Sequence, residues 1–267
     1  MSPALSSIPA LPVSLSGVGR TFGDRRVLRD IDLQIAAGEI VAIIGASGSG
    51  KSTLLRQVGG LDIPDAGTVT IDGTPLKGVD QRTAVAFQEP RLLPWRSVSR
   101  NVEVGLPRST PRAEGRARVD QLLDLVQLSD AKHLRPRQIS GGMAQRASLA
   151  RALARGPGVL VLDEPFGALD ALTRLTMQDL LLDIHAAEPA TILLVTHDVD
   201  EALYLADRVV LLGVERGYAA NSGAVVRSVI TVPGKRPRDR GSASLAQLRA
   251  ELLGGLGVST HHPAHTF

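Results

Sequence analysis

The sequence predicts an α/β protein built on a parallel, doubly wound sheet, with a smaller antiparallel β region ahead of it. Continuous apolar stretches such as 40–44, 159–162 and 191–195 are typical of strands buried on both faces. Stretches with helical spacing follow these strands, and this alternation favours a parallel sheet. From Val13 to Ile35 apolar and polar residues alternate with a period of two, which predicts antiparallel strands with one solvated face.

The composition indicates a globular chain without thiol chemistry. Of its 267 residues, 43% are hydrophobic, 21% are charged and none is cysteine, which excludes disulfides and thiolate metal sites and is compatible with a reducing compartment. The net charge is +3 and only 3% of residues are aromatic, so we interpret the basic residues as a solvated surface rather than a nucleic-acid platform. No apolar run approaches the roughly 20 residues that cross a bilayer, and we expect a soluble chain.

Turn residues and hydrophobic spacing divide the chain into elements in order. Residues 1–12, rich in Ser, Pro and Ala, are expected to be disordered. Beyond the strands within 13–35, the expected strands are 40–44, 68–72, 83–87, 159–162, 191–195, 208–212 and 225–232. The first expected helix begins at Ser52 and is broken by residues 60–67. A second helical zone has Ser97 or Ser99 as its cap and includes 119–128, and further helices are expected at 141–155 after a Ser140 cap, 172–187, 199–206 and 244–253. Polar loops are expected at 60–67, 107–117 and 233–240, and a loose tail at 254–267.

The turn after the first buried strand carries the groups needed to hold a nucleotide triphosphate. Residues 45–53, Gly-Ala-Ser-Gly-Ser-Gly-Lys-Ser-Thr, fit the spacing G-x-x-x-x-G-K-[ST]. The glycines let backbone N–H groups point inward at a helix N-terminus, Lys51 would reach the β- and γ-phosphates, and the Ser52 hydroxyl would ligate Mg²⁺. An ordinary Gly/Ser-rich turn is the alternative, but lysine occurs only at 51, 77, 132 and 235, which argues against a chance match.

Polar side chains directly follow three further buried strands. Asp163 and Glu164 end one strand, Gln88 ends another and His197 ends a third. Because the carboxyl ends of parallel strands share one edge of the sheet, we expect all four beside Lys51. There an aspartate can hold Mg²⁺ through water, a glutamate can activate the attacking water, and an amide or imidazole can reach the metal, the water or the γ-phosphate. Taken alone, the acid pair and the histidine would be structural, and the phosphate loop is what favours catalysis.

The ordered set of motifs resembles that of the ATP-binding subunits of ABC transporters. The motifs are the loop at 45–53, Gln88, Ser140-Gly-Gly-Met-Ala-Gln145, Val159-Leu-Val-Leu-Asp-Glu-Pro165, Gly167-Ala-Leu-Asp170 and His197. The likeness covers about residues 13–213, and Ser140-Gly-Gly separates this family from other phosphate-loop ATPases. It implies a RecA-like P-loop NTPase core with an antiparallel β subdomain and a helical subdomain inserted at roughly 90–155. The implied ATPase domain is 13–232, followed over 233–267 by a basic loop, a short helix and a loose tail.

The resemblance also implies ligands and roles. ATP is expected to contact Phe22, Gly45, Ala46, Ser47, Gly48, Ser49, Gly50, Lys51, Ser52 and Thr53, together with Ser140, Gly141 and Gly142 of a second copy in a head-to-tail dimer. Mg²⁺ is expected at Ser52, Gln88 and Asp163, and catalytic roles fall to Glu164, His197 and Gln88. From spacing alone, Phe22 is better explained as a half-buried hydrophobe, whereas the resemblance stacks it on adenine. Phe22 replaces a commoner tyrosine and Met143 a commoner glutamine, and neither change removes a group that hydrolysis requires.

The loop Gln88-Glu-Pro-Arg-Leu-Leu-Pro-Trp-Arg-Ser-Val98 resembles that of importers for nitrate, taurine and aliphatic sulfonates. With Thr196-His-Asp-Val-Asp-Glu-Ala-Leu203 included, the likeness to the aliphatic sulfonate importers is greatest. It implies an ATPase at the cytoplasmic face of the inner membrane, peripheral to it, that drives import through separate permease subunits and a periplasmic substrate-binding protein.

Two questions stay open at the level of sequence. Leu92, Leu93 and Trp95 could form part of a socket for a permease helix, or they could be packed core. The alternatives to an importer are an ATPase that acts on DNA or chromosomes, which would usually carry long coiled coils that this chain lacks, and an assembly scaffold. No nucleic-acid partner is expected.

Overall fold

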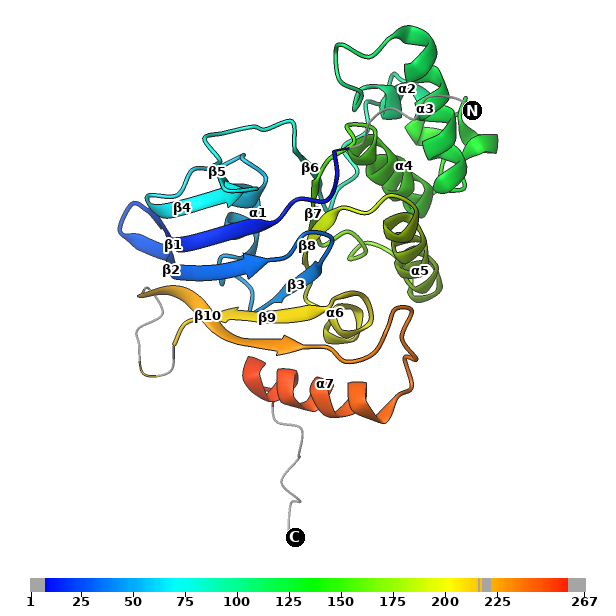
Figure 1. The fold of residues 1–267 in the computed structure, drawn as a ribbon. Helices are drawn as coiled ribbons and strands as arrows, with labels where there is room; N and C mark the ends of the chain where they lie inside the picture. The colour runs from blue at the N-terminus through cyan, green and yellow to red at the C-terminus, as the bar shows by residue number, and fades with distance from the viewer. Residues whose placement is uncertain (1–7, 216, 218–221, 259–267) are drawn as a thin grey trace.

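The computed structural model describes residues 8–215, 217 and 222–258, and these form one mixed sheet flanked by helices (Figure 1). The strand order is β5-β4-β1-β2-β10-β9-β3-β8-β7-β6. The strands are β1 (Val13–Phe22), β2 (Arg25–Ile35), β3 (Ile40–Ile44), β4 (Ala66–Ile71), β5 (Thr74–Pro75), β6 (Thr83–Ala86), β7 (Val159–Asp163), β8 (Thr191–Val195), β9 (Arg208–Gly213) and β10 (Ser222–Thr231).

The parallel half of the sheet is β9-β3-β8-β7-β6, as the apolar stretches predict. Each strand is buried on both faces because its side chains alternate between two apolar layers. In β3, for example, Ile40, Ala42 and Ile44 join one layer, and Val41 and Ile43 join the other.

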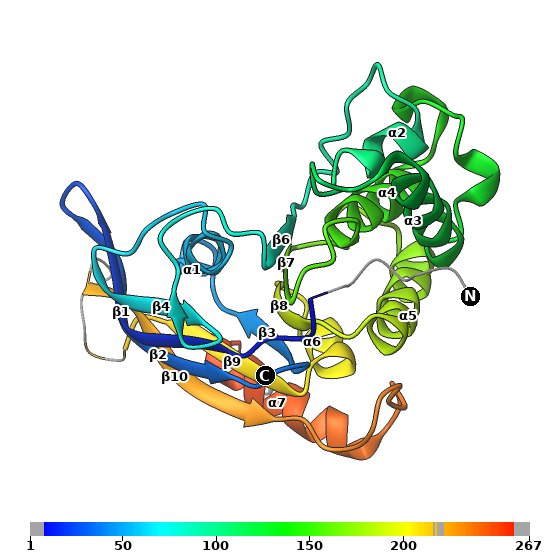
Figure 2. The same ribbon diagram turned by 45° about the horizontal axis from the view of Figure 1, so that its top comes forward.

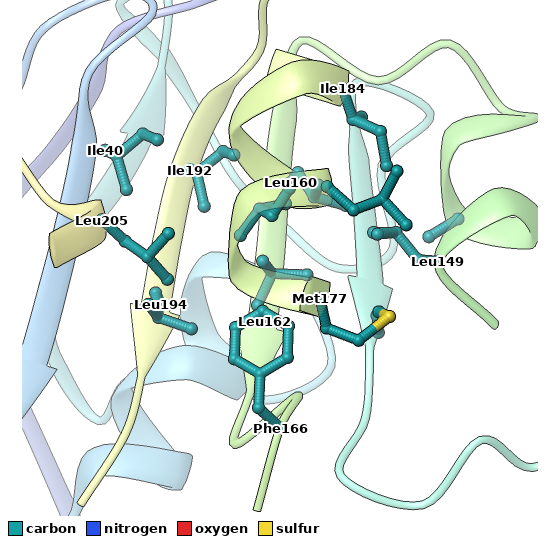
Figure 3. Packing of buried hydrophobic residues seen from close by; sticks show 14 of the residues in the cluster. Ile40, Leu149, Leu160, Leu162, Phe166, Met177, Ile184, Ile192, Leu194 and Leu205 are labelled. Carbon is teal, nitrogen blue, oxygen red and sulfur yellow. The ribbon is translucent and has the colours of Figure 1, made fainter. Parts of the chain in front are cut away.

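Helices cover both faces of this half. The layer of Ile40 lies under α4 (Gly141–Leu153), α5 (Ala171–Ala187), α6 (Val199–Leu205) and α7 (Ala243–Leu256). Figure 3 shows Ile192 and Leu160 of neighbouring strands beside Ile184 of α5 in this layer. On the opposite face, α1 (Lys51–Val58) packs between the parallel strands and the antiparallel strands β1, β2 and β4 (Figure 2). The α1 helix, and with it the loop that precedes it, is therefore held from two sides.

The antiparallel region is joined to the parallel half through β10. β1 pairs with β2 and with β4 in antiparallel fashion, and β4 pairs with β5. β10 runs antiparallel to β9 and parallel to β2, so one strand from late in the chain joins the two halves of the sheet. Two parts of the sheet that are far apart in sequence become continuous in this way.

The helices α2 (Val98–Glu103), α3 (Arg112–Leu125) and α4 pack against one another within the segment where the sequence predicts a helical subdomain. One expectation about this segment is wrong. Part of the segment expected as a polar loop at 107–117 is helical, because α3 begins at Arg112 after Pro111, a residue favoured at helix starts. Its first turns bury Gly115 and the salt-bridged Arg118, which pairs with Glu188, rather than apolar residues. The apolar spacing therefore begins too late to reveal them.

Residues 8–12 are also ordered, contrary to the expected disorder of 1–12. The N–H groups of Ile8 and Leu11 donate to the carbonyls of Gly156 and Gly158, both at 3.1 Å. The Leu11 carbonyl accepts from the hydroxyl of Thr191 on β8 at 2.6 Å. These hydrogen bonds hold the segment 8–12 against the loop before β7 and the start of β8. Residues 1–7 lie outside the described part of the chain.

The basic segment 233–240 is mostly the exposed connection that its composition predicts, but Arg238 within it is buried. The Arg238 side chain is only 8% exposed and donates to four backbone carbonyls, two of them in the last turn of α6. α7 then packs on α6 and β9, and it includes residues 254–256 of the expected loose tail, of which 259–267 lie outside the described residues. Among the described helices, none is long and apolar enough to cross a membrane.

Candidate functional site

Three neighbouring strands of the parallel half end at one edge of the sheet, and a cavity of about 500 Å³ opens there. β3 leads into the glycine-rich loop, β7 into Asp163 and Glu164, and β8 into His197. The cavity is lined by Phe22, Arg25, Val27, Gly45, Ser47, Gly48, Gly50, Lys51, Ser52, Thr53, Glu164 and His197. The expected meeting of strand ends is present, and it gathers groups from distant parts of the sequence.

The glycine-rich loop has a backbone that requires glycine. Gly48 and Gly50 have φ of +75° and +88°. A Cβ on Gly50 would lie 2.7 Å from Leu28 Cδ2 of β2, and one on Gly45 would lie 2.3 Å from the Leu212 carbonyl oxygen of β9. α1 starts directly after Gly50, which supplies no side-chain cap. The first N–H groups of the helix are therefore available to an anion.

Two polar side chains of the loop suit a phosphate ligand. Lys51 Nζ donates to the carbonyls of Gly45 at 2.8 Å and Ala46 at 3.0 Å. Burial lowers the pKa of Lys51, against the opposing effect of two nearby carboxylates. Ser49 Oγ is buried and has no hydrogen-bond partner in the described part of the chain. A buried hydroxyl normally has a partner, and a phosphate oxygen would supply one.

Asp163 and Ser52 form the pair of oxygen groups expected for a divalent cation. The Ser52 hydroxyl donates to Asp163 Oδ1 at 3.3 Å, just below the loop. Burial raises the pKa of Asp163, and the bond from Ser52 opposes this rise. No cluster of three or more His, Cys, Asp or Glu side chains occurs in the described residues. The donor set suits Mg²⁺, which takes one or two protein oxygens and completes its shell with water and phosphate.

Glu164 lies at the centre of the remaining polar groups. Its Oε2 accepts from Gln88 Nε2 at 3.2 Å and lies 3.5 Å from His197 Nδ1. Its backbone has φ of +44°, and its N–H donates to the carbonyl of Val195 at the end of β8. The loop after β7 is thereby held against β8. One carboxylate oxygen is thus shared between two side chains that the sequence expects beside it.

The rim of the cavity contains Phe22, which the sequence analysis names, and Arg25, which it does not. Phe22 is 49% exposed, and the Arg20 guanidinium carbon lies 4.4 Å from the centre of its ring. Arg25, across the β1–β2 turn, donates from Nη2 to the carbonyl of Gly48 at 3.4 Å. No motif marks Arg25, and only its place in the hairpin after Phe22 could have drawn attention to it. At 49% exposure Phe22 is half-buried, as its spacing alone predicts, and it also lines the cavity.

Ser140, Gly141 and Gly142 do not join this cavity. Ser140 caps α4, and its hydroxyl accepts from the N–H of Met143 at 3.3 Å. A Cβ on Gly141 would meet no described atom within 4 Å, whereas one on Gly142 would lie 2.8 Å from Thr173 Cγ2 of α5. The start of α4 is therefore open on one side and packed against α5 on the other.

The chain matches known proteins along most of its length. A family model described as ABC transporter matches residues 28–167. The aliphatic sulfonates import ATP-binding protein SsuB 1 of Xanthomonas axonopodis pv. citri (strain 306) is 49% identical over 251 residues, covering 93% of this chain and 96% of that protein. The aliphatic sulfonates import ATP-binding protein SsuB of Mycobacterium avium (strain 104) is 49% identical over 245 residues, covering 91% of each.

Solved structures match the fold as well. The dimeric, post-hydrolysis state of the ATP-binding cassette MJ0796 bound to ADP and Pi has a TM-score of 0.70 and 31% identity, covering 84% of this chain and 100% of that one. The cbiO1 protein of Clostridium perfringens, part of the ABC transporter complex cbiONQ, has a TM-score of 0.69 and 28% identity, covering 74% of this chain and 83% of that one.

Proposed function

This chain belongs to the ABC transporter family as the ATPase subunit of an importer, and we propose that it energises the uptake of aliphatic sulfonates through separate permease subunits. The cargo is inferred from the names of its relatives, which are aliphatic sulfonate import proteins. Taurine and nitrate are the competing cargoes, because the loop 88–98 resembles importers for all three.

The observation that carries the catalytic proposal is the shared carboxylate of Glu164. A general base must lie within hydrogen-bond reach of the water that it activates, and a second group must hold that water in line. Glu164 is placed at the mouth of the phosphate loop with Gln88 and His197 on the same oxygen. We assign Glu164 as the base, Gln88 as the group that orients the water, and His197 as a contact to the γ-phosphate.

ATP is proposed to lie along the loop 45–53 with its adenine on Phe22. Lys51 would leave its two carbonyl acceptors for the β- and γ-phosphates, and the Ser49 hydroxyl would gain the partner that it lacks among the described residues. The phosphate contacts come from Gly45, Ala46, Ser47, Gly48, Ser49, Gly50, Lys51, Ser52 and Thr53. The exposed ring of Phe22 offers a stacking face without a hydroxyl.

Mg²⁺ is proposed to bind at Ser52 and Asp163, with Gln88 nearby. Bound there, it would neutralise charge on the phosphate oxygens. The Ser52 hydroxyl now donates to Asp163, and this bond keeps both oxygens at the same place beneath the loop. Asp163 is half-buried, so its carboxylate would gain from a cation that replaces lost hydration.

Two copies of the chain are proposed to associate head to tail around ATP. Ser140, Gly141 and Gly142 lie outside the cavity of their own chain, and Gly141 leaves open space at the start of α4. A serine and two glycines at a helix N-terminus suit the approach of a phosphate. The same three residues would complete the ATP site of the opposite copy.

A permease helix is proposed to dock in an apolar groove between the sheet and the helical subdomain. The groove has a volume of about 240 Å³, and its wall includes the exposed side chains of Leu61, Val79 and Val104. Arg155 also lines the groove, so an acidic residue on the docking helix would find a partner. Exposed apolar side chains gathered in one groove are typical of protein interfaces.

The loop after Gln88 is proposed to carry the docking signal because it is fastened to the helical subdomain. The fully buried Asn101 of α2 accepts from the N–H of Leu93 and donates to the carbonyls of Leu93, Arg96 and Ser97. Arg151 of α4 donates to the carbonyls of Pro90 and Arg91.

The sequence leaves open whether the side chains of this loop are packed core or a surface for the permease. Leu92 packs against the core, whereas Trp95 is 68% exposed and free to contact a partner. The loop is therefore part core and part surface. With its permease, the subunit is proposed to sit at the cytoplasmic face of the inner membrane, where import also requires a periplasmic substrate-binding protein.

The cargo can be tested by deleting the gene and growing the strain on single sulfur or nitrogen sources. We expect loss of growth on alkanesulfonates with sulfate, taurine and nitrate unaffected, and rescue by the wild-type gene but not by Glu164→Gln. Loss confined to taurine or nitrate would contradict the sulfonate assignment. Unchanged growth on every source would instead favour a DNA-associated ATPase or an assembly scaffold.

A further inference from the structure

Arg174, in the first turn of α5, connects two of the loops that form the catalytic edge. Its Nη1 donates to Asp198 Oδ2 at 3.2 Å, and its Nη2 donates to the carbonyl of Leu169 at 3.2 Å. Asp198 follows His197, and Leu169 lies in the loop that starts at Glu164. One guanidinium group therefore joins the loop after β7 to the loop after β8.

The Asp198 carboxylate holds the backbone on the far side of His197. Its Oδ1 accepts from the N–H groups of Asp200 at 2.9 Å and Glu201 at 3.1 Å, which makes it the N-cap of α6. On the near side, the Thr196 hydroxyl accepts from the N–H of Asp198 at 3.0 Å. The short loop that carries His197 is fixed by this carboxylate, and Arg174 holds the carboxylate's second oxygen.

His197 itself has little else to hold it. Its side chain is 60% exposed, and its Nδ1 lies 3.5 Å from Glu164 Oε2. The direction of the ring is therefore set mainly by the backbone between Thr196 and Asp198. A rotation of that backbone would move the ring away from the place where a γ-phosphate would lie.

We propose that Arg174 is a positioning residue for ATP hydrolysis, which fixes His197 through Asp198 and ties it to the loop 164–170. The inference rests on the role proposed above for His197. Arg174 does not line the cavity and acts only through the loops that it joins. Its Nε is buried without a partner among the described residues, so its two terminal nitrogens carry all of its hydrogen bonds there.

A purely structural role is the competing explanation, because α5 and α6 share other polar contacts. Gln178 donates to Glu201, and Tyr204 donates to Asp179. Arg240 also contacts α5, because its guanidinium donates to Gln178 Oε1 at 2.5 Å and to Asp179 Oδ1 at 2.9 Å. Arg240 makes contacts of the same kind on the same helix but touches neither catalytic loop, so it provides a matched control.

The first test compares turnover in full-length Arg174→Ala, Arg174→Lys and Arg240→Ala. Misplacing a catalytic group by about 1 Å can lower turnover by about 100-fold. We expect kcat for ATP to fall by about 10-fold or more in Arg174→Ala with KM within about 2-fold of wild type. The kcat of Arg174→Lys should lie between those of Arg174→Ala and the wild type, because one ammonium group cannot hold both acceptors. Arg240→Ala should keep kcat within about 2-fold even if its melting temperature drops, and an equal loss of kcat there would overturn the proposal.

The second test asks whether Arg174 acts through His197. In a His197→Ala background, measured by single-turnover hydrolysis, adding Arg174→Ala should change the rate by less than about 2-fold, because the group that it positions is gone. A further loss of about 10-fold would overturn the inference. If His197→Ala is slow but Arg174→Ala is normal, this inference alone fails. If His197→Ala keeps the wild-type rate, the role proposed for His197 fails, and the positioning role fails with it.

Discussion

Replacing Arg238 by methionine should strongly destabilise the protein, although the residue lies far from the catalytic edge. Its Nε donates to the Pro233 carbonyl at 3.0 Å, Nη1 to Leu203 and Tyr204 at 3.3 and 3.1 Å, and Nη2 to Val232 at 3.3 Å. The carbonyls of Leu203 and Tyr204 belong to the last turn of α6, which has no following helical N–H groups to satisfy them.

The expected loss can be estimated from these bonds. Methionine keeps much of the apolar stem but removes every donor, so four carbonyls lose a charged partner inside the protein. A hydrogen bond to a charged group contributes about 1.5–3 kcal/mol, and such contributions are not additive. Burial also lowers the pKa of Arg238, which shows that holding this charge inside is itself unfavourable and offsets part of the gain. We expect the free energy of unfolding to fall by about 3–5 kcal/mol, or roughly 10 °C in melting temperature.

Urea unfolding followed by circular dichroism measures this change. Lys235→Met is the matched control, since it removes one positive charge from the same segment at an exposed position and should shift stability by less than about 0.5 kcal/mol. If Arg238→Met is as stable as Lys235→Met, the segment does not hold α6, and the reasoning from buried carbonyls is wrong.

Three further outcomes follow from the site and its surroundings. Glu164→Gln should retain ATP affinity while turnover falls at least ~100-fold, equivalent to about 2.7 kcal/mol of barrier, and near-normal turnover would remove Glu164 as the base. In that background, light scattering should show an ATP-dependent dimer that Ser140→Arg abolishes by placing a bulky side chain against the γ-phosphate, and an unchanged dimer would contradict the head-to-tail arrangement. Glu201 is buried, and burial is the main cause that raises its pKa from 4.5 to about 7. The folded state therefore keeps this proton while the unfolded state releases it. The free energy of unfolding should thus fall by about 3 kcal/mol as the pH rises through that interval, a slope that Glu201→Gln should lack in urea titrations and whose persistence would refute the assignment.

Much of the fold could be predicted because its core elements carry local signals. β3, β7 and β8 are short apolar runs that need partners on both faces, and Ser140 marks the start of α4 by its own side chain. The first turns of α3 were missed because their buried face contains a charged side chain, Arg118, whose partner Glu188 is remote in sequence. Local patterns cannot reveal a burial that depends on such a partner.

The residues of the candidate site also differ in whether the sequence alone reveals them. Lys51 and Ser52 belong to one compact motif, and Glu164 and His197 follow strands whose shared edge could be foreseen. Arg25 and Arg174 carry no motif, since an arginine gains its role only when a carbonyl or carboxylate from another loop meets it.

The position of β3 in the sheet means that this strand cannot pair until late in synthesis on the ribosome. β3 ends at Ile44, yet its two neighbours, β8 and β9, begin only at Thr191 and Arg208. About 150 residues separate the strand from its first partner. At roughly 5–20 residues per second, the nascent chain therefore carries an unpaired apolar strand for about 7–30 seconds. During that interval the unpaired apolar strand is a target for chaperones. We also expect the phosphate loop to be mobile until β9 has formed, because Gly45 lies against the Leu212 carbonyl of β9 in the folded protein. Nucleotide binding should therefore begin only after β9 has emerged, at a point that proteolysis of stalled nascent chains with and without ATP would locate.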